Sequence, residues 1–317
     1  MHAHITRFGP LLFIVLAAVL PLAFASGYQL FQLTLVVAYA LSVLGLNLVT
    51  GYNGQVSLGH GAFYAVGAYV TAIMMDRWDV PYWATLPVSA VVCAVFGFLL
   101  GMPALRLGGV YLALTTFALA VAVPQLLKYK LIDGWTGGVQ GITIIKPDAP
   151  YDLPLTSDQW VYLFSLAVGV LMFALASNLV HGRIGRAMVA IRDQPIAAEA
   201  MGIDIARFKT LTFATSAMFT GIGGSLAAIA VQFVSPDSFT VALSVTFFVG
   251  MVIGGAASIW GAVFGALFIE FVPNIADHLS KAAPGAIYGV ILIAFMFLAP
   301  GGIASLLRRW FARLAVK

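Results

Sequence analysis

The chain has 317 residues, of which 62% are hydrophobic and only 9% are charged, and its formal net charge is +4. An average soluble domain is about a quarter charged and less than half apolar, so a soluble fold of this composition would lack the polar side chains that cover a core. We therefore expect an all-α, polytopic membrane protein in which residues 1–317 form one transmembrane domain. The single cysteine, Cys93, excludes a disulfide framework and a cysteine-based metal site.

Ten apolar segments follow one another along the chain, and most of them approach the length of about 20 residues that a helix needs to cross a bilayer. The segment 259–274 is short for a span. Ten crossings place both termini on the same side of the membrane. The predicted spans are 8–25, 29–49, 56–75, 82–101, 109–127, 159–180, 209–231, 239–257, 259–274 and 284–300.

Basic residues test this topology, because cytoplasmic loops carry an excess of Lys and Arg. With a cytoplasmic N-terminus, eleven of the 16 basic residues lie inside and five lie outside. The inner ones are Arg7, Arg106, Arg183, Arg186, Arg192, Arg207, Lys209, Arg308, Arg309, Arg313 and Lys317. The outer ones are Arg77, Lys128, Lys130, Lys146 and Lys281. We therefore expect both termini in the cytoplasm.

The first apolar segment has an alternative interpretation. His2, His4 and Arg7 precede it and it ends near Ala25, a pattern that is also typical of a cleaved signal peptide. An apolar run of this length is long for a signal core, so we prefer a retained span. The orientation of the later spans is the same in both interpretations.

A stretch rich in glycine and free of charge joins the second and third predicted spans, and we call residues 51–61 the Gly-rich segment. Glycine disfavours regular helix by about 1 kcal/mol per residue. Non-helical backbone at membrane depth is tolerated only where it is buried in protein or lines a wet cavity. We interpret the segment as a broken helix beside a translocation path; the alternative is a cytoplasmic turn that leads into a packing helix.

Polar residues in and near the spans are the candidates for lining such a path. For His60 we expect a hydrogen-bonded structural role rather than a proton carrier. Glu270 is the one acid within a predicted span, which makes it a candidate by default, although its place near the outer end also suits a residue that snorkels to the surface. The path candidates are Asn47, Asn53, Gln55, Ser57, His60, Thr115, Thr116 and Glu270.

Two further sets of residues predict contacts between helices. Three glycine pairs at a spacing of four allow backbones to approach closely in lipid; they are Gly97/Gly101, Gly250/Gly254 and Gly261/Gly265. Hydrogen bonds between helices are expected from side chains within or beside the spans, namely Asn47, Thr115, Thr116, Thr212 and Thr215.

Two loops are too long to be simple connections. The outer loop, 128–158, is rich in Gly and Pro and has Trp135, Tyr151 and Trp160 within or beside it, which predicts a folded cap at headgroup level. The inner loop, 181–209, is the most polar stretch of the chain. It predicts one short helix over 187–192 and a second helix after it.

The second inner helix has both of its boundaries marked. Asp193 or Gln194 can cap its start, where Pro195 suits the first turn. Gly202 supplies a left-handed stop. Helical spacing gives it an apolar face, formed by Ile196, Ala197, Ala200 and Met201. Charged neighbours hold this face in water, and an apolar face rimmed by charge usually marks a protein contact.

The sequence offers no machinery for chemistry of its own. A phosphate-binding loop needs a lysine directly after a glycine, and none of the six lysines follows one. If ATP drives this protein, another chain binds it. No carboxylate pair, histidine cluster or Ser-His-Asp pattern stands at a sensible spacing. We therefore expect no catalytic site, no metal and no cofactor in this chain.

The inner loop resembles the coupling loop of bacterial ABC importer permeases, with the core AAEAMG at 197–202. This core departs from the literal Glu-Ala-Ala signature, as is usual in the branched-chain amino-acid and sugar permease superfamily. Within it the chain resembles the M-type permeases of high-affinity branched-chain amino-acid transporters. The stretches that carry the resemblance are 54–63 (GQVSLGHGAF), 111–116 (YLALTT), 136–142 (TGGVQGI), 185–202, 232–239 (QFVSPDSF) and 300–303 (PGGI).

The resemblance implies an ABC importer permease fold in a bacterial inner membrane, with leucine, isoleucine or valine as substrate. It also implies the partners, which are an H-type permease, two cytoplasmic ATPase subunits that bind the ATP, and a periplasmic solute-binding protein, with no nucleic acid. The residues implied in coupling to the ATPase are Arg192, Asp193, Pro195, Ala198, Glu199 and Gly202. Similar permeases carry urea or aromatic compounds. An ion-coupled carrier remains a rival, although such carriers often have charges at the bilayer midplane.

Overall fold

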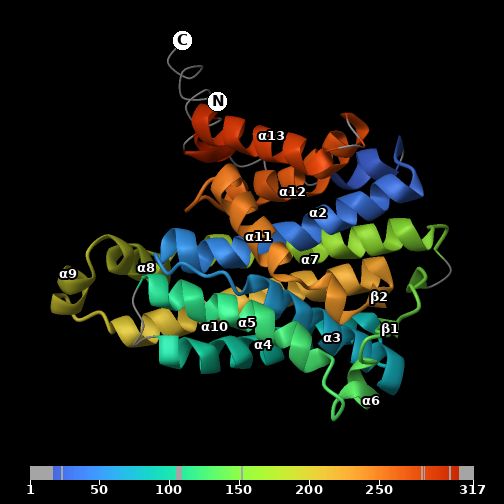
Figure 1. Cartoon of the computed structure of the whole chain (residues 1–317), viewed down its shortest axis with the longest axis horizontal. Coiled ribbons are helices and arrows are strands. Elements are labelled where there is room, and N and C mark those ends of the chain that lie inside the picture. Colours follow the sequence, from blue (N-terminus) through green and yellow to red (C-terminus); the bar gives the residue numbers. More distant parts are fainter. Residues whose placement is uncertain are drawn as a thin grey trace.

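The structure is a computed structural model of the chain, and it describes residues 17–22, 24–104, 109–150, 153–279, 281, 283–299 and 301–306. It is almost entirely helical, with most long helices lying side by side (Figure 1). The elements are α2 (Gly27–Leu46), η1 (Asn47–Tyr52), α3 (His60–Trp78), α4 (Tyr82–Ala104), α5 (Val110–Leu127), α6 (Asp133–Thr136), β1 (Ile142–Thr143), α7 (Ser157–His181), α8 (Arg183–Asp193), α9 (Pro195–Ala200), α10 (Ile205–Val231), β2 (Phe233–Val234), η3 (Pro236–Ser238), α11 (Val241–Gly254), α12 (Ile259–Leu279) and α13 (Pro284–Leu298).

The all-α class is confirmed, and eight helical segments of the described chain are long and apolar enough to cross a membrane. They are Gly27–Tyr52, Tyr82–Met102, Val110–Leu127, Ser157–His181, Ile205–Val231, Pro236–Gly254, Ile259–Asp277 and Gly285–Leu306. The expectation of ten spans is therefore confirmed for eight. Most of the first predicted span, 8–25, lies outside the described residues, and so do Arg308, Arg309, Arg313 and Lys317.

The remaining predicted span corresponds to α3, which is a helix but is not among the eight. It carries Tyr64, Tyr69 and Thr71, all of them buried. α3 packs against α4, α5 and α10, so protein rather than lipid surrounds much of it. α3 begins with His60 and includes Asp76 and Arg77 in its last turn, and these polar residues lower its mean hydropathy below that of the eight segments.

The core of the bundle is α10 with α2, α3 and α4 around it. Three glycines of α10 each allow a different neighbouring helix to approach closely. A side chain at Gly221 would meet Cys93 of α4, one at Gly223 would meet the Ala38 carbonyl of α2, and one at Gly224 would meet Tyr64 of α3. Close approach of this kind is the main source of packing between helices in lipid, where the hydrophobic effect gives no preference for protein over lipid.

The three glycine pairs of the sequence also lie where helices touch. Gly97 and Gly101 of α4 face α10, where a Cβ at Gly97 would stand 2.5 Å from Ala217 Cβ. Gly250 and Gly254 of α11 face Gly265 and Gly261 of α12. The prediction that these pairs serve tight helix packing is confirmed.

The outer loop is folded, as predicted. It contains α6 and strand β1, and β1 pairs antiparallel with β2 in the register Ile142↔Val234 and Thr143↔Phe233. Lys128 forms an ion pair with Asp237, which fixes the start of the loop to η3. The loop is therefore attached to the segment that joins α10 to α11.

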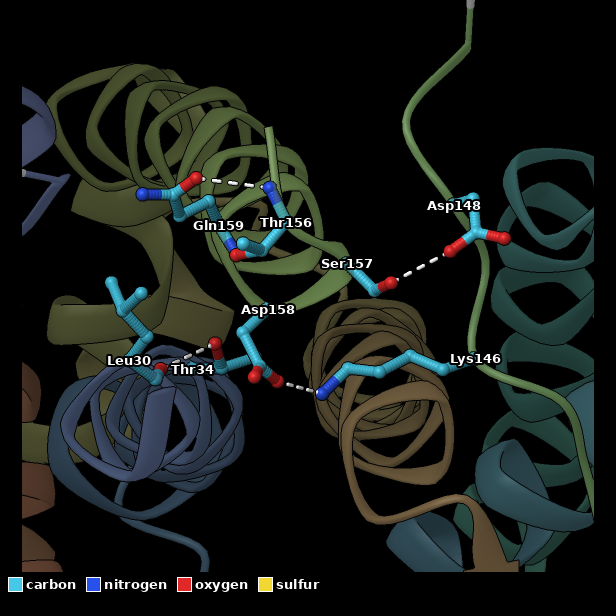
Figure 2. Close-up of polar contacts among 8 residues, drawn as sticks. All are labelled: Leu30, Thr34, Lys146, Asp148, Thr156, Ser157, Asp158 and Gln159. Atoms are coloured by element: carbon cyan, nitrogen blue, oxygen red, sulfur yellow. Dashed lines mark hydrogen bonds and ion pairs between the residues drawn. The ribbon is translucent and has the colours of Figure 1, made fainter. Parts of the chain in front are cut away.

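The far end of the outer loop is fixed to the start of α7. Figure 2 shows Lys146 reaching from the loop to Asp158, and Ser157 Oγ donating to Asp148 Oδ1 at 2.6 Å. Thr156 and Gln159 form a capping box at this start. Asp158 also lies against Gly27 in the first turn of α2. The positive end of the helix dipole stabilises a carboxylate at that position.

The loops predicted outside contact one another, and so do the loops predicted inside, which agrees with the predicted topology. Loops predicted outside join one another through the β1–β2 pair, the Lys128–Asp237 ion pair and a bond from Arg77 Nη2 to Gly134 O at 2.8 Å. Loops predicted inside join through other bonds, described below. In Figure 1 the pair α8–α9 and the group α6, β1 and β2 lie at opposite ends of the bundle.

Candidate functional site

The Gly-rich segment follows a helix that ends in a wide turn. α2 continues into η1, a π-helical turn, and residues 53–59 have no regular helix before α3 begins at His60. Asn47 holds η1 against the start of α12, because its Nδ2 donates to Ser258 O and its Oδ1 accepts from Ala257 N, both at 2.8 Å. Irregular turns of this type are frequent at functional sites. The helix is interrupted between Tyr52 and His60, as both interpretations of the segment expect, and its place beside a path stays a prediction.

Ser57 and His60 belong to a buried chain of hydrogen bonds. Ser216 Oγ lies 2.6 Å from the Gly45 carbonyl oxygen, which can only accept, so the Ser216 hydroxyl donates there. His60 Nε2, also 2.6 Å from Ser216 Oγ, must then carry the proton. Nδ1 of His60 is left as acceptor for the Ser57 hydroxyl at 3.1 Å. This assignment satisfies both ring nitrogens of a neutral histidine and supports the structural role expected for His60.

Two further bonds fix the Gly-rich segment to α5 and α11. The Leu58 N–H donates to Thr116 Oγ1 and the Gly61 N–H donates to Ser244 Oγ, both at 2.9 Å. A Cβ at Gly59 would stand 2.8 Å from the Thr116 carbonyl oxygen, so only glycine allows this approach. The segment is therefore in contact with several helices at once.

The remaining path candidates have mixed placements. Gln55 is buried, and its Nε2 donates to Lys209 O at 3.4 Å. Asn53 is 2% exposed, and neither polar atom of its side chain has a partner in the described structure. Glu270 is half-buried on α12. Thr115 is exposed on α5 and bonds the Tyr111 carbonyl of its own helix. The structure assigns none of these residues to a path, and that role stays a prediction.

Hydrogen bonds between helices were expected from five side chains, and the structure corrects three of them. Thr115, Thr212 and Thr215 bond carbonyls within their own helices. Hydroxyls spaced three or four residues from a carbonyl of the same helix reach it more easily than they reach a neighbour. Asn47 and Thr116 do join separate segments.

The serines that bond to His60 and Gly61 from other helices, Ser216 and Ser244, were not identified from the sequence. Each lies in a largely apolar helix, and no local pattern marks its partner. Only the tertiary fold brings it to the Gly-rich segment.

The inner loop forms α8 and α9. α8 begins at Arg183, four residues before the predicted start, and buries Met188 and Ile191. α9 begins at Pro195, as predicted, but its cap position, Gln194, makes no side-chain hydrogen bond to the helix. Asp193 instead accepts from Arg192 Nε at 2.8 Å.

The end of α9 has the geometry of a Schellman motif. Gly202 is left-handed with φ of 82°, its N–H donates to Glu199 O at 2.9 Å, and the Ile203 N–H donates to Ala198 O at 3.1 Å. The predicted stop at Gly202 is confirmed. Ala198 is the residue of α9 that is buried, against the body of the protein.

The other side of α9 carries apolar side chains in the open. Ile196 is 83% exposed and Met201 is 82% exposed, and both lie in the polar inner loop rather than in a predicted span. We call Ile196, Ala197, Ala200 and Met201, all exposed, the α9 surface. Glu199 is exposed beside it. The arrangement suits a contact with another protein.

Arg192, just before α9, is exposed but its side chain reaches the Gly-rich segment. Its Nη1 donates to Gly51 O at 2.8 Å, and its Cγ lies 2.8 Å from the position that a Cβ on Gly54 would take. Gly54 is left-handed, with φ of 73°. The inner loop and the Gly-rich segment, 141 residues apart in sequence, therefore meet at this arginine.

Comparisons with known proteins agree with this architecture. The model of a family described as the permease component of branched-chain amino acid transport systems matches residues 28–300. The high-affinity branched-chain amino acid transport system permease protein LivM of Escherichia coli K12 is 30% identical over 300 residues, which cover 87% of this chain and 69% of LivM. LivH of Salmonella typhimurium, a permease of the same kind of system, is 25% identical over 310 residues, which cover 87% of this chain and 94% of LivH.

One solved structure also aligns with the chain. It is described as an inward-facing ABC transporter of the metal-chelate type, and the match covers 92% of this chain and 96% of that one at 18% identity with a TM-score of 0.44. A likeness at that level supports no argument on fold or function. The family match spans most of the helical bundle, including the Gly-rich segment and α8–α9. This chain belongs to the family of branched-chain amino acid transport permeases.

Proposed function

We propose that this chain is the transmembrane permease subunit of a bacterial ABC importer for leucine, isoleucine and valine. It forms the translocation path with a second, H-type permease in the inner membrane. Two cytoplasmic ATPase subunits bind the ATP, and a periplasmic binding protein delivers the substrate. The chain itself holds no ATP, metal or cofactor. Family membership supports the class of substrate, since the relatives above are named as branched-chain amino acid permeases.

The observation that carries the coupling to an ATPase is the α9 surface. Ile196 and Met201 are more than four-fifths exposed on a short helix that begins at Pro195, ends in a Schellman motif and packs against α8. A surface of this kind can enter a groove of a cytoplasmic subunit and follow its movement. Pro195, Ala198 and Gly202 set the shape of the helix, and Asp193 and Glu199 supply charge at its rim.

Uptake by the reconstituted complex tests the proposal. The complex, isolated through a tag on this chain, is placed in liposomes with ATP inside or outside, and accumulation of leucine, isoleucine, valine, urea and phenylalanine is measured. We expect ATP-dependent uptake of the three branched-chain amino acids. Uptake of urea or phenylalanine instead would change the substrate. Accumulation driven by an ion gradient without ATP would contradict the ABC assignment.

A further inference from the structure

Arg192 was implied above among the residues that couple to the ATPase, yet the hydrogen bonds of its side chain are made within this chain. The guanidinium makes two bonds of 2.8 Å in different directions, from Nε to Asp193 Oδ1 and from Nη1 to Gly51 O. The aliphatic stem lies against Gly54. The stem and the tip of the side chain are therefore both in contact with the Gly-rich segment, while about a third of the side chain stays exposed.

Gly51 O is a special acceptor. It belongs to the last turn of η1, which ends the continuous helical segment Gly27–Tyr52. Carbonyls at the end of a helix lack partners from the next turn, and the negative end of the helix dipole favours a cation there. Arg192 supplies both the donor and the charge. Arg192 therefore caps the C-terminal end of the helical segment Gly27–Tyr52, although it belongs to a loop that is distant in sequence.

The segment that Arg192 contacts is connected to the rest of the core. Within a few residues of Gly51 it bonds to α10 through Gln55 and to α5 through Leu58, and then to α11 through Gly61. Asn47 at the start of η1 holds the beginning of α12. Direct hydrogen bonds thus connect the backbone around Gly51 to several membrane helices.

We propose that Arg192 is a positioning residue that transmits movement of α8–α9 to the Gly-rich segment, rather than a docking contact for the ATPase. The inference rests on the proposed function, since it assumes that an ATPase moves the α9 surface. Arg192 stands three residues before α9 begins, so a displacement of α9 displaces its guanidinium and with it the Gly51 carbonyl. Without this side chain, α9 still docks but its movement no longer reaches the membrane helices.

The test compares Arg192→Met with two other substitutions in the same loop. Arg186→Met is the matched control, because Arg186 Nη1 donates to His181 O at the end of α7 and not to the Gly-rich segment. Ile196→Asp places a charge on the α9 surface and disrupts docking. For each complex, purified through a tag on this chain, we would measure the bound ATPase subunits, ATP hydrolysis and uptake of leucine in liposomes.

For Arg192→Met we expect a normal amount of ATPase subunit and continued ATP hydrolysis, with leucine uptake per ATP hydrolysed lowered at least tenfold. Arg192→Lys should resemble it, because an ammonium cannot make both bonds of the planar guanidinium. Arg186→Met should transport normally, and Ile196→Asp should lose the ATPase subunits.

Two results would overturn the inference. If Arg192→Met loses the ATPase subunits as Ile196→Asp does, Arg192 is a docking residue; if it transports like the wild type, its bond to Gly51 transmits nothing. Gly54→Ala provides a second route in case Arg192→Met folds poorly, since its Cβ would press on the Arg192 stem and should also uncouple transport. Failure of the wild-type complex to hydrolyse ATP or carry leucine would instead contradict the proposed function.

Discussion

The Gly-rich segment and the α9 surface both depend on glycine, but for different physical reasons. Gly59 has an ordinary negative φ, and what excludes a side chain there is the Thr116 backbone 2.8 Å from its Cβ position. Gly202 has open space around it, with nothing within 4 Å, and what excludes most residues is its left-handed φ of 82°. One glycine is required by its neighbours and the other by its own backbone.

This difference between Gly59 and Gly202 predicts which substitutions each position tolerates. A larger side chain of any type is harmful at Gly59, because the space is occupied. At Gly202 size is unimportant, and a residue that accepts the left-handed conformation, such as asparagine, can replace glycine. The Gly-rich segment is thus limited by packing inside the bundle, and the α9 surface by the local geometry of one turn.

The comparison assumes that the α9 surface lies on the cytoplasmic side, opposite the outer cap, and cysteine labelling tests this in an all-or-none way. The native Cys93 is buried, so background labelling should be low. Gln140 in the outer cap and Gln194 before α9 are both exposed. A membrane-impermeant maleimide added to whole cells, with access to the periplasm, should label Gln140→Cys and leave Gln194→Cys unlabelled. The reverse pattern would refute the topology.

Gly59→Val should have the largest effect on transport. The added side chain must displace the Thr116 backbone of α5 or the start of α3, and overpacking of this type costs about 1–3 kcal/mol. We expect the protein to insert in the membrane and associate with its partners, but leucine uptake should be abolished. Immunoblots of membranes and uptake assays measure the two properties. Loss of insertion would show that the segment serves packing alone.

Gly202→Val should be nearly as severe, through a different step. A β-branched residue is a strong outlier in the left-handed region, so the end of α9 must change shape at a cost of about 1–2 kcal/mol. ATPase subunits should be lost when the complex is purified through this chain. Gly202→Asn is the matched control and should retain them. Equal loss in both variants would show that the side chain itself collides with the partner, which contradicts a backbone requirement.

Much of this architecture was predictable because membrane spans and helix ends leave local signals. Apolar length identified the eight spans that the structure supports, and the Pro195 and Gly202 positions marked both ends of α9. α3 falls short of the composition of a span because the helix also includes His60, Asp76 and Arg77. The start of α8 was placed late, since Gly182 and Gly185 obscure a helix that tertiary contacts support.

The connections of the candidate site were not predictable in the same way. Arg192 was identified in the sequence as part of the inner loop, but its bond to Gly51 spans 141 residues. Ser216 and Ser244 are ordinary residues of apolar helices until the fold brings them to His60 and Gly61. Local patterns carry information about helix ends, whereas contacts between distant helices depend on the packing of the whole bundle.

Ser216→Ala should have the smallest effect on transport and should act through stability. It removes the acceptor for His60 Nε2 and one donor to Gly45 O, inside the protein. A buried polar group left without its partner costs about 1–3 kcal/mol. We therefore expect a lower midpoint of thermal unfolding for the purified complex, while leucine uptake well below that midpoint stays close to normal.

Ser42→Ala is the control for Ser216→Ala, because Ser42 is equally buried but bonds only the Ala38 carbonyl of its own helix at 3.0 Å. Its removal leaves a carbonyl that the helix backbone can still satisfy, so the midpoint should hardly change. A fall in uptake for Ser216→Ala at temperatures where the complex is intact, without one for Ser42→Ala, would contradict the structural role of His60. It would mean that the hydrogen-bonded chain from Ser57 to Gly45 takes part in transport, since stability alone would then fail to explain the loss.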